Sequence, residues 1–317
     1  MATLLIIGGT GFFGKSILDS FKREQLNSWK IDKVIIMSRN ALQFKEDYPE
    51  LISKGVEFFV GDISTINELP RADFVIHAAA STDASRYLTH NEEEKNNIIA
   101  GTLNYCQLAL KFHKNSKIVF CSSGAVYGYQ SSTVKFLKEN DVFGDLSKLD
   151  DYKKSYAYAK RNSEAAIKEL GKKDINVSIA RCFTFVGKYL PLKGYFAIGN
   201  FIADGLKGEE IHVKTDKLVY RSYMYADDLV QWLMTLAENS NISCPTYNVA
   251  SDQEFEIREL AQIVAKIFNV EARLTECKKE SEIDRYIPSI QKAKKELGLS
   301  NKYDIKHSIR MTIEQLI

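Results

Sequence analysis

The composition of this chain is that of an ordinary soluble globular protein. Its 317 residues are 45% hydrophobic and 26% charged, enough to bury one large core or two smaller ones and too apolar for disorder. The 43 basic and 41 acidic side chains leave a net charge of +2, so no strong positive field is available to hold nucleic acid. Apolar runs fall short of the ~20 residues that span a bilayer, and the short, uncharged start does not resemble a signal peptide. We therefore expect a cytoplasmic protein that binds neither nucleic acid nor a membrane.

The five cysteines are scattered along the chain and odd in number. None of them belongs to a C-x-x-C pair, the spacing typical of many metal and redox sites. We therefore expect reduced thiols, as in the cytoplasm, and no bound metal.

Short runs rich in β-branched residues alternate with longer amphipathic stretches up to about residue 180. The expected strands are Thr3–Ile7, Lys33–Met37, Val56–Val60, Phe74–His77, Lys117–Cys121 and Val177–Ala180. Each is apolar almost throughout, which is typical of strands buried on both faces of a parallel sheet. The expected helices between them are Phe12–Glu24, about Glu92–His113, and Ser155–Lys172. This alternation predicts an α/β fold with a Rossmann-type, doubly wound parallel sheet.

The alternation stops near residue 182, where a second lobe is expected to begin. Short strands, glycine-bearing loops and helices such as Ile257–Phe268 and Ser289–Leu297 follow. We assign residues 1–183, with about 215–243, to the Rossmann domain. Residues of about 184–214 and 244–317 are assigned to a smaller α/β substrate-binding lobe.

The first expected strand runs into a glycine-rich turn, Gly8-Gly9-Thr10-Gly11-Phe12-Phe13-Gly14, and a helix follows. A dinucleotide pyrophosphate must lie almost against the backbone to use the amides and dipole of a helix N-terminus. Side chains at Gly8, Gly11 or Gly14 would obstruct the turn, the phosphate or the helix–strand packing. Three glycines also occur in ordinary turns, but the strand before and the helix after complete the dinucleotide-binding motif. The whole turn, including Thr10, Phe12 and Phe13, is therefore expected to contact a cofactor.

The end of the second strand indicates which dinucleotide binds. An acidic residue there would bind the 2′-hydroxyl of NAD and repel a 2′-phosphate. This chain has Ser38 and Arg39, a hydroxyl donor and a guanidinium that suit the phosphate of NADP. If Arg39 is only a solvated loop charge, NAD remains possible. We therefore expect NADP as the cofactor.

The third and fourth strands also end in candidate cofactor contacts. Asp62 and Ile63 follow the third strand, and Ala78, Ala79 and Ala80 follow the fourth. Ligands of open α/β sheets bind at the carboxyl ends of the strands. Asp62 can accept a hydrogen bond from the adenine amino group, and the small alanines let a cofactor pass close to the backbone.

A tyrosine and a lysine four residues apart, Tyr156 and Lys160, carry the expected chemistry. Their spacing on a helix puts them on one face, one turn apart. Tyrosine ordinarily titrates near pH ~10, and a neighbouring ammonium favours the phenolate, bringing proton exchange toward neutral pH. The ammonium can also reach the nicotinamide ribose. Because this spacing is common on helices, a third group must show whether the pair is catalytic. Ser123, with Ser122 beside it, follows the fifth strand and can hydrogen-bond the same substrate oxygen.

Together these motifs resemble the extended short-chain dehydrogenase/reductase family, in its nucleotide-sugar epimerase, dehydratase and ketoreductase branch. The resemblance covers nearly the whole chain and includes Arg221-Ser222-Tyr223 and Arg285 ahead of a C-terminal helix. It implies that Ser123, Tyr156 and Lys160 are catalytic. It also implies that Asn200, Arg221 and Arg285 hold a nucleotide diphosphate, a task that suits arginine. Proteins of this family pair two helices per subunit into a homodimer, here the helices near residues 100–113 and 155–172.

Two features depart from the family pattern. Its dehydratases have an Asp-Glu pair directly after the catalytic hydroxyl, where this chain has Gly124 and Ala125. Neither residue can transfer a proton, so 4,6-dehydration is not expected. Thr184 stands where relatives usually have asparagine, and we expect it among the substrate contacts.

The remaining machinery predicts hydride and proton transfer at C4 of a nucleotide-activated sugar. A 4-ketoreductase that uses NADPH, in polysaccharide or deoxysugar biosynthesis, is preferred because reductive biosynthesis draws on NADPH. A 4-epimerase with tightly bound NAD(P) fits the same residues. A sensor or scaffold that binds NADP without chemistry is the alternative of another class, and the intact set of Ser123, Tyr156 and Lys160 speaks against it.

Overall fold

The structure is a computed structural model that describes residues 1–80, 84–194, 196–278 and 283–317. Its contacts divide the chain into two compact units. The first comprises residues 1–129, 143–182 and 230–247, and the second comprises residues 130–142, 183–229 and 248–317. Residues 215–229, which the sequence-based boundaries grouped with the Rossmann domain, thus make their contacts in the second unit.

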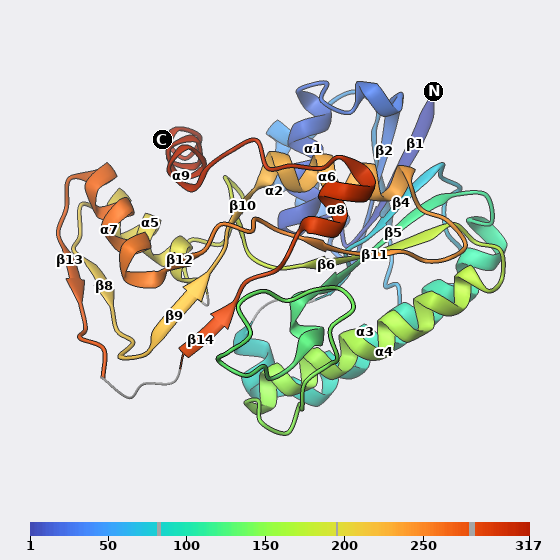
Figure 1. Cartoon of the computed structure of the whole chain (residues 1–317). Helices are drawn as coiled ribbons and strands as arrows, with labels where there is room; N and C mark the ends of the chain where they lie inside the picture. Colours follow the sequence, from blue (N-terminus) through green and yellow to red (C-terminus); the bar gives the residue numbers. More distant parts are fainter. Residues whose placement is uncertain (81–83, 195, 279–282) are drawn as a thin grey trace. The chain divides into compact units, whose positions relative to one another are not determined.

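A seven-stranded sheet forms the centre of the first unit, with the strand order β11-β6-β5-β4-β1-β2-β3 (Figure 1). The strands are β1 (Ala2–Ile7), β2 (Ile31–Ser38), β3 (Val56–Val60), β4 (Phe74–His77), β5 (Lys117–Ser123), β6 (Val177–Cys182) and β11 (Thr246–Val249). The pairings among β1 to β6 are parallel. This confirms the expected Rossmann-type α/β fold. The strand order switches between β1 and β4, and ligands of such sheets bind at the carboxyl ends beside that switch.

Helices flank both faces of this sheet (Figure 1). They are α1 (Phe12–Lys22), α2 (Ala41–Asp47), α3 (Ala84–Phe112), α4 (Asp151–Gly171) and α6 (Ala226–Glu238), with short 3-10 helices η1 (Asn27–Trp29), η2 (Pro49–Leu51) and η3 (Gly124–Tyr127). The first residues of α6, up to Leu229, belong to the second unit. Helices α3 and α4 lie alongside one another. Helix α3 begins before the expected Glu92 because a first segment precedes a kink at His90, whose φ of −136° and ψ of 39° are not helical.

The central strands are buried on both faces, as their apolar sequences predict. Leu4, Leu5 and Ile6 are fully buried and Ile7 is 1% exposed. Strand β5 continues two residues beyond the expected end, so Ser123 is its last residue and pairs in register with Cys182 of β6. Sheet pairing therefore fixes the backbone of the candidate catalytic serine.

The second unit consists of short strands and helices, as expected from the loss of alternation. Its strands form three small sheets, β12-β9-β14, β13-β8 and β10-β7. The strands are β7 (Phe185–Val186), β8 (Ile211–Val213), β9 (Leu218–Arg221), β10 (Met224–Tyr225), β12 (Phe255–Glu256), β13 (Ala272–Leu274) and β14 (Ile283–Tyr286). The helices are α5 (Ala197–Leu206), α7 (Ile257–Phe268), α8 (Gln291–Leu297) and α9 (Ile305–Glu314). Among the described residues of either unit, no helix combines the length and apolar character needed to cross a bilayer.

Candidate active site

The glycine-rich turn joins β1 to α1 at the carboxyl edge of the sheet. Gly8 has a φ of +83°, which favours glycine, and a Cβ there would lie 2.6 Å from the Cα of Ala79. A Cβ on Gly14 would lie 1.9 Å from the carbonyl oxygen of Gly9. Both glycines are thus required by the packing of the turn against β4 and of α1 against β1.

Gly11 is different, because the protein itself does not require a glycine there. A Cβ on Gly11 would meet only the Gly8 oxygen at 3.7 Å, an ordinary contact. Gly11 is also the N-cap residue of α1 and brings no side chain to the first amides of that helix. A bare helix N-terminus with room for a close approach is what a dinucleotide pyrophosphate needs, so the residues present fit such a cofactor.

The expected cofactor residues at the ends of β2, β3 and β4 are brought together with this turn. The Thr10 and Ser38 hydroxyl oxygens are 3.1 Å apart, and Arg39 Nη1 is 3.6 Å from Asp62 Oδ2. Arg39 remains 63% exposed in this pair. Burial alone would raise the pKa of the Asp62 carboxyl, but hydrogen bonds from Ser64 and the charge of Arg39 lower it overall. A charged carboxylate therefore holds Arg39 at the rim of the site.

The remaining cofactor positions line the same edge. Phe12 and Phe13 start α1 with their rings edge to face, 5.9 Å between centroids. Ile63 follows Asp62, and its carbonyl oxygen accepts a hydrogen bond of 2.8 Å from Asn104 Nδ2. Ala78 and Ala79 lie against Gly8. Ala80 follows them and packs against a small cluster of α3 and α4 side chains.

The three expected catalytic residues also meet in the first unit. Tyr156 and Lys160 lie one turn apart on α4, and the Tyr156 side chain hydrogen-bonds that of Ser123. Lys160 is 2% exposed, and its Nζ donates to the Cys121 carbonyl oxygen at 2.9 Å. The Ser123 hydroxyl also accepts from the Ala125 amide at 3.1 Å. The sequence spacing therefore predicted a real cluster of hydroxyl, phenol and ammonium.

The titration of this cluster differs from the expectation. Burial raises the pKa of the Tyr156 phenol above its ordinary value, and the hydrogen bond from Ser123 offsets only part of that rise. Burial likewise lowers the pKa of the Lys160 ammonium. The expected lowering of the phenol pKa by the neighbouring cation is therefore not found in this structure, because burial has the largest effect on that pKa. The phenol is a protonated donor at neutral pH.

Ser122 and Ser123 face opposite sides of strand β5, because successive strand residues alternate. Ser123 is half-buried, whereas the Ser122 hydroxyl is buried and donates to Glu164 Oε1 at 2.7 Å. Ser122 thus meets Glu164 of α4, whereas Ser123 meets Tyr156 of the same helix. Sequence reasoning missed Glu164 and its partner Arg181; the only signal was that Glu164 lies one turn beyond Lys160.

In the second unit, Thr184 and Asn200 hydrogen-bond to nearby backbone. Thr184 Oγ1 donates to the Ser222 carbonyl oxygen. Asn200 accepts from the Gly194 amide at 3.0 Å and donates to its carbonyl oxygen at 2.9 Å. Asn200 also borders a hollow of about 810 Å³ formed by α5, β8 and the start of α7, with Phe201, Val213 and acidic side chains in its lining.

The two expected phosphate-binding arginines are not brought together. In the register of β9 and β14, Arg221 pairs with Tyr286, and Arg285 pairs with Tyr220. Arg221 and Arg285 therefore project from opposite faces of this sheet. Arg221 forms a two-pronged ion pair with Asp284, at 3.0 and 2.9 Å, whereas Arg285 pairs with Glu254.

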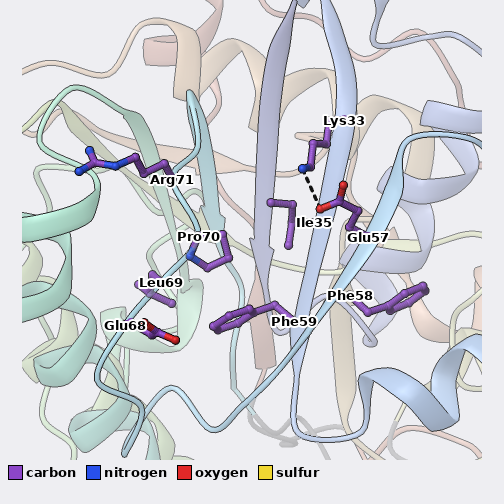
Figure 2. Close-up of a pocket in the computed structure, with 9 residues that line it drawn as sticks. All are labelled: Lys33, Ile35, Glu57, Phe58, Phe59, Glu68, Leu69, Pro70 and Arg71. Carbon is purple, nitrogen blue, oxygen red and sulfur yellow. Dashed lines mark ion pairs between the residues drawn. The ribbon is translucent and has the colours of Figure 1, made fainter.

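A further hollow, of about 440 Å³, lies on the first unit over β2 and β3 (Figure 2). Figure 2 shows Lys33 and Glu57 beside each other across these strands, with Nζ and Oε2 2.7 Å apart. Leu69, Pro70 and Arg71, ahead of β4, complete the lining. None of these lining residues is among the expected cofactor-binding or catalytic residues, so we do not count the hollow as part of the candidate active site.

Among the described residues, no cluster of three or more His, Cys, Asp or Glu side chains is arranged to hold a metal ion. The chemistry of the candidate site rests on a phenol, an ammonium and a hydroxyl beside a dinucleotide-binding turn.

Most of the chain matches the model of a known protein family. The model of the NAD dependent epimerase/dehydratase family matches residues 4–250. The chain belongs to this family, which confirms the resemblance drawn from its motifs.

Relatives match over nearly the full chain at low identity. UDP-glucuronic acid decarboxylase 5 of Arabidopsis thaliana is 25% identical over 314 residues, which are 98% of this chain and 88% of that protein. UDP-glucose 4-epimerase of Thermotoga maritima, solved with UDP-glucose, has a TM-score of 0.80 at 20% identity and covers 99% of this chain and 98% of its own. The dTDP-glucose 4,6-dehydratase of Streptomyces venezuelae, solved with NAD, has a TM-score of 0.79 at 20% identity and covers 99% of this chain and 96% of its own. These two structures share the fold.

Proposed function

We propose that this protein is an oxidoreductase that reduces the C4 ketone of a nucleotide-linked sugar with NADPH. The hydrogen-bonded pair of Tyr156 and Ser123, with Lys160 Nζ 5.8 Å from the centre of the Tyr156 ring, carries this proposal. A bound nicotinamide supplies the hydride to C4. Ser123 orients the ketone oxygen, and Tyr156, kept protonated by its burial, delivers the proton to that oxygen.

Gly124 and Ala125 favour reduction or epimerisation over the other reactions named among the similar proteins. Dehydration needs an acid and a base at C6 and C5 in addition to chemistry at C4, and decarboxylation leaves C5 to be protonated. Gly124 and Ala125, the first two residues of the 3-10 helix η3, carry no titratable atoms. The site thus supports one proton transfer at one oxygen.

Ser38 and Arg39 support NADPH. Arg39 is exposed and lies in a long ion pair with Asp62, so a 2′-phosphate can recruit it at little cost. The similar dehydratase was solved with NAD, and its family is described as NAD dependent. NAD would therefore be the cofactor of the second candidate function, a 4-epimerase that returns the hydride to the sugar from which it was taken.

For the substrate, we propose that Arg221 and Asn200 bind the nucleotide diphosphate, with Thr184 near the sugar. Arg221 presents a planar guanidinium that already holds a carboxylate in two-pronged geometry, and a phosphate takes the same geometry. Arg285 projects from the other face and pairs with Glu254, so we assign the diphosphate to Arg221. The hollow beside Asn200 offers Phe201 and Val213 to a flat base.

We further propose a homodimer built on α3 and α4. Leu103 and Tyr158 on these helices are about half exposed, at 50% and 49%. Paired with a second copy, these side chains would be buried. Sedimentation at micromolar concentration should give a dimer, and Leu103→Glu should give monomers; a monomeric wild type contradicts this assembly.

The reaction is tested with a panel of nucleotide-linked 4-keto-6-deoxy sugars and nucleotide hexoses. A ketoreductase consumes one NADPH per alcohol formed, measured by absorbance and mass spectrometry. An epimerase interconverts C4 epimers with no net use of dinucleotide. Loss of water from dTDP-glucose at a rate near one per second would contradict both.

A further inference from the structure

A buried ion pair lies next to the catalytic serine in the first unit. Arg181 of β6 donates from Nε and Nη2 to the two carboxylate oxygens of Glu164 of α4, at 3.0 and 2.9 Å. Both side chains are 3% exposed. A charge pair so fully removed from water requires good geometry and additional hydrogen bonds, so its surroundings are informative.

The pair contacts both ends of the segment that carries Ser123. Ser122, at one end, donates its hydroxyl to Glu164 Oε1 at 2.7 Å. Tyr127, at the other end, hydrogen-bonds Arg181, whose guanidinium carbon lies 4.9 Å from the centre of the Tyr127 ring. Phe143 covers the guanidinium at the same distance, 4.9 Å. Residues 122–127 are therefore tied to the ion pair at their first and last positions.

Successive turns of α4 hold three consecutive residues of β5. Lys160 binds the Cys121 carbonyl oxygen, Glu164 binds the Ser122 hydroxyl, and Tyr156 binds the Ser123 hydroxyl. These three helix residues lie four apart and share one face. The contact of Glu164 thus belongs to the same alignment of helix and strand that brings phenol and hydroxyl together.

Stability alone is a poor explanation for this pair. Replacing a buried ion pair by apolar side chains of similar volume is often neutral or stabilising, whereas removing one partner leaves a buried charge. What the pair provides, and apolar side chains do not, is a directional bond to Ser122 and to Tyr127. Catalytic groups need such support, because a misplacement of ~1 Å can cost ~10²-fold in rate.

We propose that Glu164 and Arg181 are positioning residues that fix Ser123 against Tyr156. The pair acts through Ser122 and Tyr127 and touches neither substrate nor cofactor. This inference rests on the proposed function, because it assigns to the pair the alignment of the groups that carry the proton.

The test uses three variants of the full chain. Ser122→Ala removes only the link between the pair and the segment. Glu164→Met with Arg181→Met removes both charges and keeps the volume. Glu169→Gln is the matched control, since it removes an exposed ion pair with Lys172 on the same helix, 2.6 Å long.

We expect the first two to lower kcat about tenfold or more, with KM and the dinucleotide Kd within about twofold of the wild type. The double variant should keep its unfolding temperature, yet exchange amide hydrogens faster in residues 122–128. The control should change none of these. A double variant with wild-type kcat and wild-type exchange overturns the proposal. If Tyr156→Phe keeps full activity in this assay, the proposed function itself fails. If Tyr156→Phe loses activity but the variants of Ser122, Glu164 and Arg181 keep it, the proposed function stands and the positioning role is wrong.

Discussion

The two units of this chain hold their polar groups in different ways. In the first unit, the proposed catalytic side chains and those that support them bind one another and the strand backbone in buried positions: Lys160 and Glu164, taken as whole residues, are each 2% exposed. In the second, Arg221 pairs with a carboxylate at the surface, with side-chain exposures of 23% for the arginine and 45% for Asp284. The first arrangement is fixed by the scaffold before any ligand arrives. The second consists of pairs that a ligand can exchange for its own charge, which suits recognition rather than chemistry.

Among substitutions in the first unit, removal of the phenol oxygen should cause the largest loss of activity. Tyr156→Phe should lower kcat by ~10²–10⁴-fold, because a general acid–base group is lost. The dinucleotide Kd should change little, since ring and helix remain. Single-turnover kinetics measure the rate of the chemical step, and fluorescence titration with NADPH measures the dinucleotide Kd. A loss below about tenfold would show that another group carries the proton.

Substitutions in the second unit should weaken binding of the nucleotide sugar without slowing the chemical step. Arg221→Ala should raise KM for the nucleotide sugar by about 10–100-fold and leave kcat nearly unchanged, because a hydrogen bond to a charged group is worth ~1.5–3 kcal/mol. Arg285→Ala is the matched variant and should raise KM less than about threefold. Steady-state kinetics at saturating dinucleotide decide this. Equal effects of the two substitutions would contradict the assignment by sheet face, and a fall in kcat would break the contrast between the units.

Cofactor choice is the expected role of one exposed arginine of the first unit. Arg39→Ala should weaken NADPH by ~1.5–3 kcal/mol, or roughly 10–150-fold, and leave NADH nearly unchanged, because only NADPH has the 2′-phosphate. Arg310→Ala removes another exposed guanidinium, from α9, and serves as the control. Titration of both dinucleotides measures the ratio. Equal weakening of both would mean that Arg39 supports Asp62 rather than a phosphate.

A buried carboxyl gives the second unit a pH-dependent stability. Burial raises the pKa of Asp228 to about 6, although the Lys302 and Tyr303 amides that bind it lower the pKa. The stability that this group contributes is full below its ordinary value of 3.8 and is lost as pH rises through about 6. The loss is at most about 3 kcal/mol for a shift of this size.

Asp228→Asn should abolish that loss, because its amide oxygen can accept the same two hydrogen bonds without a charge. Relative to the wild type, the variant should gain unfolding temperature between pH 4 and pH 7. Asp151→Asn changes an exposed acid in the first turn of α4 and should show no such gain. A constant difference between Asp228→Asn and the wild type across this range would show that desolvation of Asp228 does not govern stability.

The sequence was most informative where a short motif sits on a regular element. The glycine turn between a strand and a helix, and the four-residue spacing of Tyr156 and Lys160, fix local geometry through chain periodicity alone. The strands Val56–Val60 and Phe74–His77 and the helix Ile257–Phe268 have the bounds that their patterns predict. The start of α3 was missed, because a kink at His90 separates its first segment from the rest of the helix.

Side-chain direction and titration were decided only by the tertiary structure. Ser122 and Ser123 are chemically identical neighbours, and only strand β5 and helix α4 determine which one meets the phenol. Arg221 and Arg285 look equivalent as motifs, but their register between β9 and β14 places them on opposite faces. The pKa of Tyr156 depends on desolvation by residues distant in sequence, which no local spacing encodes. Periodicity is a property of the chain, whereas burial and register arise only when separate segments meet.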